Sequence, residues 1–189
     1  MMGYTEPKPH HSENSNREME KEMNDRMQAA FNAQITEELF SSYVYLAMAA
    51  HFETLNLEGF TNWMKHQAQE ELVHAMRLFA HINRRGGRVE LEAIGKPPLE
   101  YGTPVEVFEK ALAHERHISK CIHNLYKVAQ EENDYPAQLE LQWFVDEQVE
   151  EEETAGRAVD QLRMAGDNQS ALLMLDREMA QRTSESEEE

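Results

Sequence analysis

Long stretches of the chain repeat apolar side chains every three or four residues, which is the period of an amphipathic helix. This pattern, interrupted by Gly and Pro, predicts four long helices over about 17–53, 58–84, 103–133 and 134–166, and a short fifth helix over 170–180. The third helix opens on Thr103-Pro-Val-Glu106, which has the spacing of a capping box with proline at the first helical position. We therefore expect an all-α protein.

The connection between the second and third helices is long. Residues 88–103 hold two glycines and two prolines and are not expected to be helical. A helix of about 28 residues is roughly 42 Å long, whereas about 16 extended residues reach roughly 53 Å. The connection can therefore cross the whole length of a bundle, with Val89, Leu91 and Ile94 as its apolar side. We predict a four-helix bundle with one long crossover between helices two and three, plus a short fifth C-terminal helix.

The two ends of the chain lack this periodicity. Residues 1–16 carry two prolines among mostly polar side chains, and residues 182–189 are rich in Ser and Glu. We expect one bundle domain over 17–181, between a flexible N-terminal tail (1–16) and an acidic C-terminal tail (182–189).

Each of the four long core stripes is interrupted near its middle by a carboxylate. The four acids are Glu38, Glu71, Glu115 and Glu151, and His74 follows Glu71 by one helical turn. A buried ionised carboxylate is costly unless it is paired, and no Lys or Arg falls on these stripes. We therefore expect one or two divalent cations between the helices. Carboxylates with one imidazole suit iron, manganese or zinc, and iron fits best where positions remain open for oxygen.

Tyr45 lies on the same face as Glu38, seven residues and two turns further along. We interpret its phenol as a hydrogen-bond donor or a redox-active group near the metals rather than as a simple core residue. The remaining histidines are expected on polar surfaces, and they are His10, His11, His51, His66, His81, His114, His117 and His123.

Composition and charge narrow the class of protein. The 189 residues are 40% hydrophobic, which is enough for one domain with a sizeable core. With 18 Lys and Arg against 36 Asp and Glu, the formal net charge is −18, which disfavours nucleic acid as a partner and attracts metal cations.

The cysteine content and the hydropathy of the chain indicate in which cellular compartment the protein is expected. The single cysteine, Cys121, excludes an intrachain disulfide framework and fits a reducing compartment. No apolar stretch approaches the roughly 18 residues of a membrane span, and the N-terminus lacks the apolar region of a signal peptide. We expect a cytoplasmic protein without a membrane partner.

Several segments together resemble the ferritins, specifically the non-haem bacterial type, over about residues 20–180. They are Glu38-Leu-Phe-Ser-Ser-Tyr-Val-Tyr45, Ala68-Gln-Glu-Glu-Leu-Val-His74, His114-Glu115, the Asp134-Tyr-Pro136 turn and the run from Leu141 to Glu152. The resemblance implies a di-iron ferroxidase centre in which Glu38, Glu71 and His74 hold the first iron and Glu71 bridges to the second.

The resemblance implies roles for the neighbouring side chains as well. Glu115 would bind the second iron, with Gln148 and Glu151 at or beside it. A third, looser iron site would use four acids, namely Glu70, Glu147, Glu150 and the shared Glu151. Tyr45 would be the tyrosine that accompanies the centre.

The implied reaction is oxidation of Fe²⁺ by O₂ or peroxide, followed by storage of ferric mineral inside a homo-oligomeric shell of twenty-four subunits. The short fifth helix would lie near the fourfold axes of that shell. Haem is not expected, because the haem-binding methionine of the bacterioferritin type would fall at Leu72. Gln148-x-x-Glu151 also replaces the second Glu-x-x-His pair of bacterioferritins and rubrerythrins.

Alternatives remain at the level of sequence. One is a di-metal oxidase with iron or manganese, because ligand type does not separate these metals. Another is an iron buffer that lacks rapid oxidation or a closed shell. A purely structural helical assembly is disfavoured by four stripe acids without a basic partner.

Overall fold

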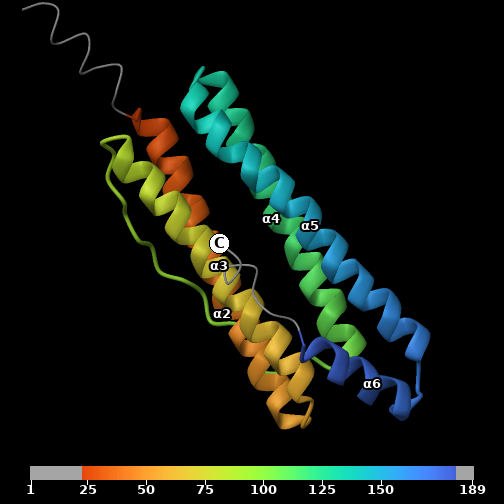
Figure 1. Cartoon of the computed structure of the whole chain (residues 1–189). Coiled ribbons are helices and arrows are strands. Elements are labelled where there is room, and N and C mark those ends of the chain that lie inside the picture. Colours follow the sequence, from red (N-terminus) through yellow and green to blue (C-terminus); the bar gives the residue numbers. More distant parts are fainter. Residues whose placement is uncertain (1–22, 182–189) are drawn as a thin grey trace, which may run out of the picture.

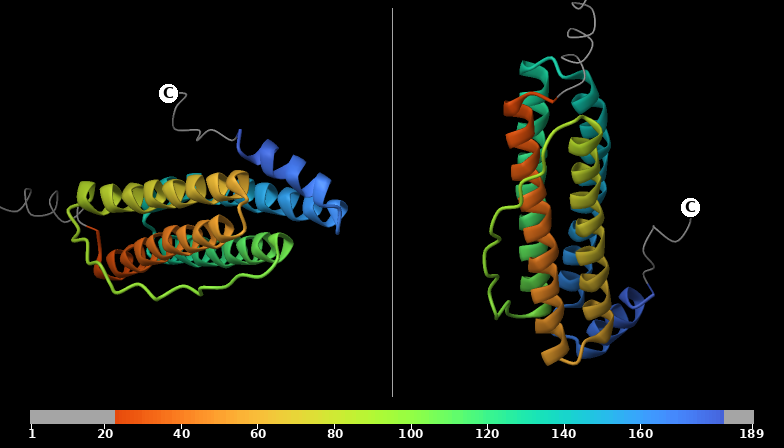
Figure 2. Two further views of the ribbon diagram at one scale, coloured as in Figure 1. Left: turned by 90° about the horizontal axis from the view of Figure 1, so that it is seen from below. Right: turned by 90° about the vertical axis from the view of Figure 1, so that its left-hand side faces the viewer.

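The computed structural model describes residues 23–181, which form five helices and contain no strand (Figure 1). The helices are α2 (Asp25–Thr54), α3 (Glu58–Arg84), α4 (Pro104–Glu131), α5 (Tyr135–Ala165) and α6 (Gln169–Met179). The four long helices lie side by side as a bundle, and α6 lies at one end of it (Figure 2). The predicted fold class is therefore confirmed. No helix in the described range is long and apolar enough to cross a membrane.

The first described helix starts later than predicted. The Asn24 side chain accepts a 2.8 Å hydrogen bond from the amide of Met27 and so caps α2, which begins at Asp25. The predicted start near Arg17 is therefore wrong for residues 23 and 24, because the N-terminal cap at Asn24 sets the start of the helix at the next residue. Residues 17–22 and both predicted tails lie outside the described residues.

The starts of α4 and α5 follow their local sequence signals. The Glu106 carboxylate accepts hydrogen bonds from the amide and hydroxyl of Thr103 at 2.7 and 2.8 Å, as the capping-box spacing predicts. Asp134 caps α5 by accepting a 3.1 Å bond from the amide of Ala137. Arg85 pairs with Asp134 at 2.8 Å, so the end of α3 is tied to the start of α5.

The crossover, residues 88–103, runs beside α2 from one end of the bundle to the other, so that α3 and α4 are parallel (Figure 2). Asn32 on α2 holds its first part. The Asn32 amide nitrogen donates to the carbonyl of Arg88 at 3.0 Å, and its carbonyl oxygen accepts from the amide of Glu90 at 3.0 Å.

The predicted apolar side of the crossover is only partly correct. Val89 packs against the core, but Leu91 and Ile94 are 65% and 41% exposed in the single chain. The prediction is wrong for these two residues, because no element of the single chain, within the described residues, covers their side chains.

The core consists of two apolar clusters separated along the bundle axis by a polar layer. The first cluster includes Phe52, Phe60 and Phe108, whose ring centroids are 5.3 to 5.9 Å apart. The second, toward the other end, includes Phe31 and Ile122. The polar layer between the clusters contains the acids that the sequence places near the middle of each stripe.

Helix α6 closes the end of the bundle at the start of α3. Its apolar side packs onto the first cluster through Leu172, Leu175 and Met179. The Asp176 carboxylate accepts a 2.9 Å hydrogen bond from the amide of Phe60, which the first turn of α3 leaves without a helical partner. A Cβ atom added at Gly59 would lie 1.6 Å from the Asp176 carbonyl oxygen, so the close approach of α6 requires glycine here.

Two histidines that were expected on the surface are buried. His51 is 6% exposed, and its Nε2 lies 2.8 Å from the carbonyl oxygen of Gly102, because the end of the crossover covers it. His81 is 4% exposed and stacks on Phe31 with ring centroids 4.8 Å apart. Both predictions were wrong because neighbouring segments cover faces that are polar in the helix sequence.

Candidate metal centre

The polar layer brings together predicted site residues from all four long helices. Six of them are at most 5% exposed, and they are Glu38, Glu71, His74, Glu115, Gln148 and Glu151. Helical periodicity accounts for this burial, since each residue lies on the same stripe as the apolar residues above and below it. The layer is thus a group of buried acidic and polar side chains between two apolar clusters.

Glu38, Glu71 and His74 form the tightest group in the layer. Each offers a ligand atom, and these atoms lie within 4.8 Å of one another. His74 Nδ1 is 3.4 Å from Glu71 Oε2. A cation between these side chains would have two carboxylates and one imidazole as ligands, which is a set that suits iron, manganese or zinc.

Glu115 and Glu151 bring the acids of α4 and α5 to the layer. The Tyr45 hydroxyl, fully buried, donates a hydrogen bond to Glu115 Oε1. The Gln67 amide donates to Glu151 Oε2 at 2.7 Å. These bonds orient the two carboxylates and leave Glu115 Oε2 without a hydrogen-bond partner among the described residues.

Unpartnered oxygen atoms are concentrated in this layer. Besides Glu115 Oε2, Glu38 Oε2 and both carboxylate oxygens of Glu71 are buried with no hydrogen-bond partner in the described part of the chain. A buried polar atom without a partner costs about 1–3 kcal/mol, and a charged one costs more. Cations held between the carboxylates would supply the missing partners, so the donor set fits iron.

Two supporting side chains were not singled out from the sequence. The Gln34 amide donates to Glu38 Oε1 at 2.9 Å, and the Ser119 hydroxyl donates to Gln148 Oε1 at 3.1 Å. Gln34 precedes Glu38 by four residues and Ser119 follows Glu115 by four. This spacing places each of them on the same helix face as an acid. It was the signal in the sequence from which these two residues could have been found.

The acids assigned to a third iron site lie at the edge of the layer. Glu147 Oε1 is 3.8 Å from His74 Nε2, and the Glu147 side chain is 23% exposed. Glu70 is half-buried, whereas Glu150 is exposed. The structure therefore brings Glu147 to the group around His74 and leaves Glu150 on the outside of α5.

A family model described as a ferritin-like domain matches residues 28–165. The chain belongs to the ferritin family. It is 42% identical over 160 residues to the bacterial non-heme ferritin of Bacteroides fragilis, covering 85% of this chain and 99% of that protein. It is 37% identical over 158 residues to the bacterial non-heme ferritin of Staphylococcus haemolyticus, covering 84% and 95%.

The solved open-pore ferritin of Archaeoglobus fulgidus shares 45% identity with this ferritin chain, at a TM-score of 0.84. The match covers 85% of this chain and 99% of that one. Membership in the family confirms the resemblance drawn from the sequence. It supports iron storage with ferroxidase activity as the function of the chain.

Burial and mutual repulsion perturb the acids of this ferritin. Burial raises the pKa of Glu38 and of Glu71 well above the usual range, and the charges of neighbouring acids raise both further. Burial also raises the pKa of Glu115, to about 7. For His74, burial lowers the pKa, but the neighbouring acids outweigh it and the net shift is upward.

These shifts predict that the metal-free protein becomes less stable as pH rises. The folded state binds protons on Glu38, Glu71 and Glu115 more tightly than the unfolded chain, where the ordinary pKa is 4.5. The stability they contribute is present below that value and is lost as pH rises through about 7 for Glu115. The slope is up to about 1.4 kcal/mol per pH unit for each group.

Urea unfolding of iron-free protein between pH 5 and pH 8 measures this slope. General repulsion among the surface acids acts in the same direction, so Glu71→Gln is the matched control and should flatten the profile. Stability that is constant or rises over this range in the parent protein would contradict the prediction.

Proposed function

We propose that each subunit contains a di-iron ferroxidase centre in the polar layer. Glu38, Glu71 and His74 bind one Fe²⁺, and Glu71 bridges to a second Fe²⁺ bound by Glu115, with Gln148 and Glu151 beside it. The observation that supports this proposal most directly is the set of buried carboxylate oxygens without partners, to which each of α2, α3 and α4 contributes. Family membership supports the same metal.

Two Fe²⁺ ions in such a centre supply the two electrons that reduce O₂ to hydrogen peroxide, or peroxide to water, with uptake of two protons. The carboxylates stabilise the higher charge of the product Fe³⁺ ions. Glu147 and Glu70, at the edge of the layer, would form a third site with Glu151 and Glu150 once iron is present.

Tyr45→Phe tests whether the orientation of Glu115 matters. The substitution removes the buried hydroxyl that donates to Glu115 Oε1. Loss of a partner that orients a metal ligand typically costs 10–100-fold, so we expect initial Fe²⁺ oxidation to slow by about tenfold or more. The rate of ferric absorbance measures this. Tyr43→Phe, an exposed tyrosine on the same helix, is the control, and equal rates in the two variants would contradict the assignment.

We propose further that the chains assemble into a hollow 24-subunit shell in the cytoplasm. The similarity to a ferritin structure over 85% of this chain supports the assembly. Exposed apolar side chains along the crossover, including Leu91, Ile94 and Leu99, offer surface for contacts between copies. The single cysteine supports a reducing compartment.

Aerobic iron loading followed by size-exclusion chromatography tests the storage function. Fe²⁺ is added far above the number of protein ligands, and iron and protein are measured in each fraction. We expect rapid oxidation and co-elution of excess iron with a shell-sized species. Oxidation that stops after a few ions per chain, with the remainder precipitating, would instead indicate a di-metal oxidase or an iron buffer without mineral storage.

A further inference from the structure

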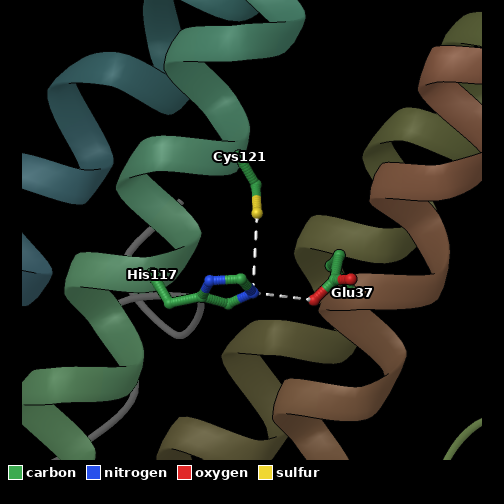
Figure 3. Close-up of side chains that lie close together, drawn as sticks. All are labelled: Glu37, His117 and Cys121. Atoms are coloured by element: carbon green, nitrogen blue, oxygen red, sulfur yellow. Dashed lines mark hydrogen bonds and ion pairs between the residues drawn. The ribbon is translucent and has the colours of Figure 1, made fainter.

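A second group of ligand-type side chains lies outside the polar layer, between α2 and α4 (Figure 3). It consists of Glu37 on α2 and of His117 and Cys121 on α4, and their ligand atoms lie within 4.8 Å of one another. His117 and Cys121 are four residues apart and therefore share one face of α4. The Glu37 carboxylate approaches the His117 ring from the opposite helix.

The distances from the His117 ring nitrogen to the other two ligand atoms are those expected in a tetrahedral metal site. His117 Nε2 lies 3.6 Å from Cys121 Sγ and 3.3 Å from Glu37 Oε2. Zinc bonds of about 2.0 Å to nitrogen and oxygen and about 2.3 Å to sulfur, at tetrahedral angles, separate N from S by about 3.5 Å and N from O by about 3.3 Å. The position of His117 relative to Cys121 and to Glu37 therefore already suits a bound ion.

The chemistry of the three ligands differs from that of the polar layer. Cys121 is the only cysteine in the chain, so the layer contains no thiolate ligand. A thiolate with an imidazole favours softer ions such as zinc over magnesium or calcium. The side chains of His117 and Glu37 are 56% and 38% exposed, which leaves room for water as the fourth ligand.

We propose that Glu37, His117 and Cys121 bind a divalent transition-metal ion, with zinc as the preferred occupant, at a site separate from the ferroxidase centre. Binding replaces the thiol proton of Cys121 with the metal, and the proton passes to solvent. Glu37 directly precedes Glu38, and His117 follows Glu115 by two residues. An ion at this site therefore links α2 to α4 beside the segments that carry the iron ligands.

Cobalt is the probe for this site, because a thiolate bound to Co²⁺ adds a near-ultraviolet charge-transfer band that carboxylates and imidazoles do not give. Iron-free, reduced full-length protein is titrated with Co²⁺ and then with Zn²⁺. We expect the band to saturate at the intensity of one thiolate-bound Co²⁺ per chain, whatever the polar layer also binds, and to disappear as Zn²⁺ displaces the cobalt. Absence of the band in the parent protein would overturn the proposal.

Variants distinguish a metal site formed by all three side chains from binding by the Cys121 thiol alone. Cys121→Ser should lose the band, and His117→Ala should weaken Co²⁺ binding by about tenfold or more. His123→Ala, an exposed histidine on the same helix, should bind as the parent does. Equal affinity in His117→Ala and the parent would show a lone thiol and overturn the proposal. Glu71→Gln should keep the band, which distinguishes this site from failure of the proposed ferroxidase centre.

Discussion

Replacement of Glu71 with alanine is expected to abolish fast Fe²⁺ oxidation while the bundle still folds. Both carboxylate oxygens of Glu71 are buried in the polar layer without a hydrogen-bond partner among the described residues, and in the proposed centre they bridge the two ions. Loss of an outer partner of a metal ligand costs 10–100-fold, so loss of the bridge itself should slow oxidation by at least about 100-fold. Stopped-flow absorbance of ferric product measures the rate.

The metal-free form of this variant should be no less stable than the parent at neutral pH. Burial, together with the charges of Glu115 and Glu151, raises the pKa of Glu71, so its removal relieves the cost of holding this carboxyl in the polar layer. Circular dichroism and thermal melting check the fold. Glu92→Ala on the crossover is the control, because Glu92 is exposed and does not belong to the polar layer. Equal oxidation rates in both variants would refute the assignment of Glu71.

Gly59→Ala is expected to detach α6 from the end of the bundle. The new Cβ would lie 1.6 Å from the carbonyl oxygen of Asp176, and a backbone atom cannot rotate away as a side chain can. Displacement of α6 also breaks the bond from the Phe60 amide to Asp176. We expect a loss of about 3 kcal/mol, at the upper end of overpacking penalties. Urea unfolding measures the loss, and limited proteolysis within residues 166–181 reports release of α6.

Gly156→Ala is the matched control for this prediction. Gly156 lies inside α5, and a Cβ added there meets no atom within 4 Å. Alanine at an open helical position should stabilise the fold by about 0.5–1 kcal/mol. If both alanine variants changed stability alike, the close approach of Asp176 to Gly59 would not be the cause.

Much of the fold could be predicted because its signals are local. Side chains such as Glu106 and Asp134 fix helix starts by accepting bonds from the amides of Thr103 and Ala137, each three residues away. The exposure of Leu91 and Ile94 could not be predicted in this way, because it depends on how the whole crossover lies on the bundle and not on a local signal. The burial of His51 likewise depends on a segment about fifty residues further along the chain.

The candidate site was predictable because helical spacing and burial are linked. Glu71 and His74 occupy core positions of α3, so their burial follows from the spacing of Phe60, Met64 and Leu78. The spacing did not reveal the bonds that orient the acids, such as the one from Gln34 to Glu38. It also did not separate Glu147, beside His74, from the exposed Glu150, because the helix is acidic all round at this point.

The division of the core into two apolar clusters by a polar layer has a consequence for how the helices align along the axis. A slide of one helix by a single turn, about 5.4 Å, would move its carboxylate into an apolar cluster and bring hydrocarbon into the layer. Glu115, for example, would then lose the Tyr45 hydroxyl as its hydrogen-bond donor. Buried polar residues are known to fix helix register in this way. The acids therefore select one axial alignment of the bundle before any metal binds.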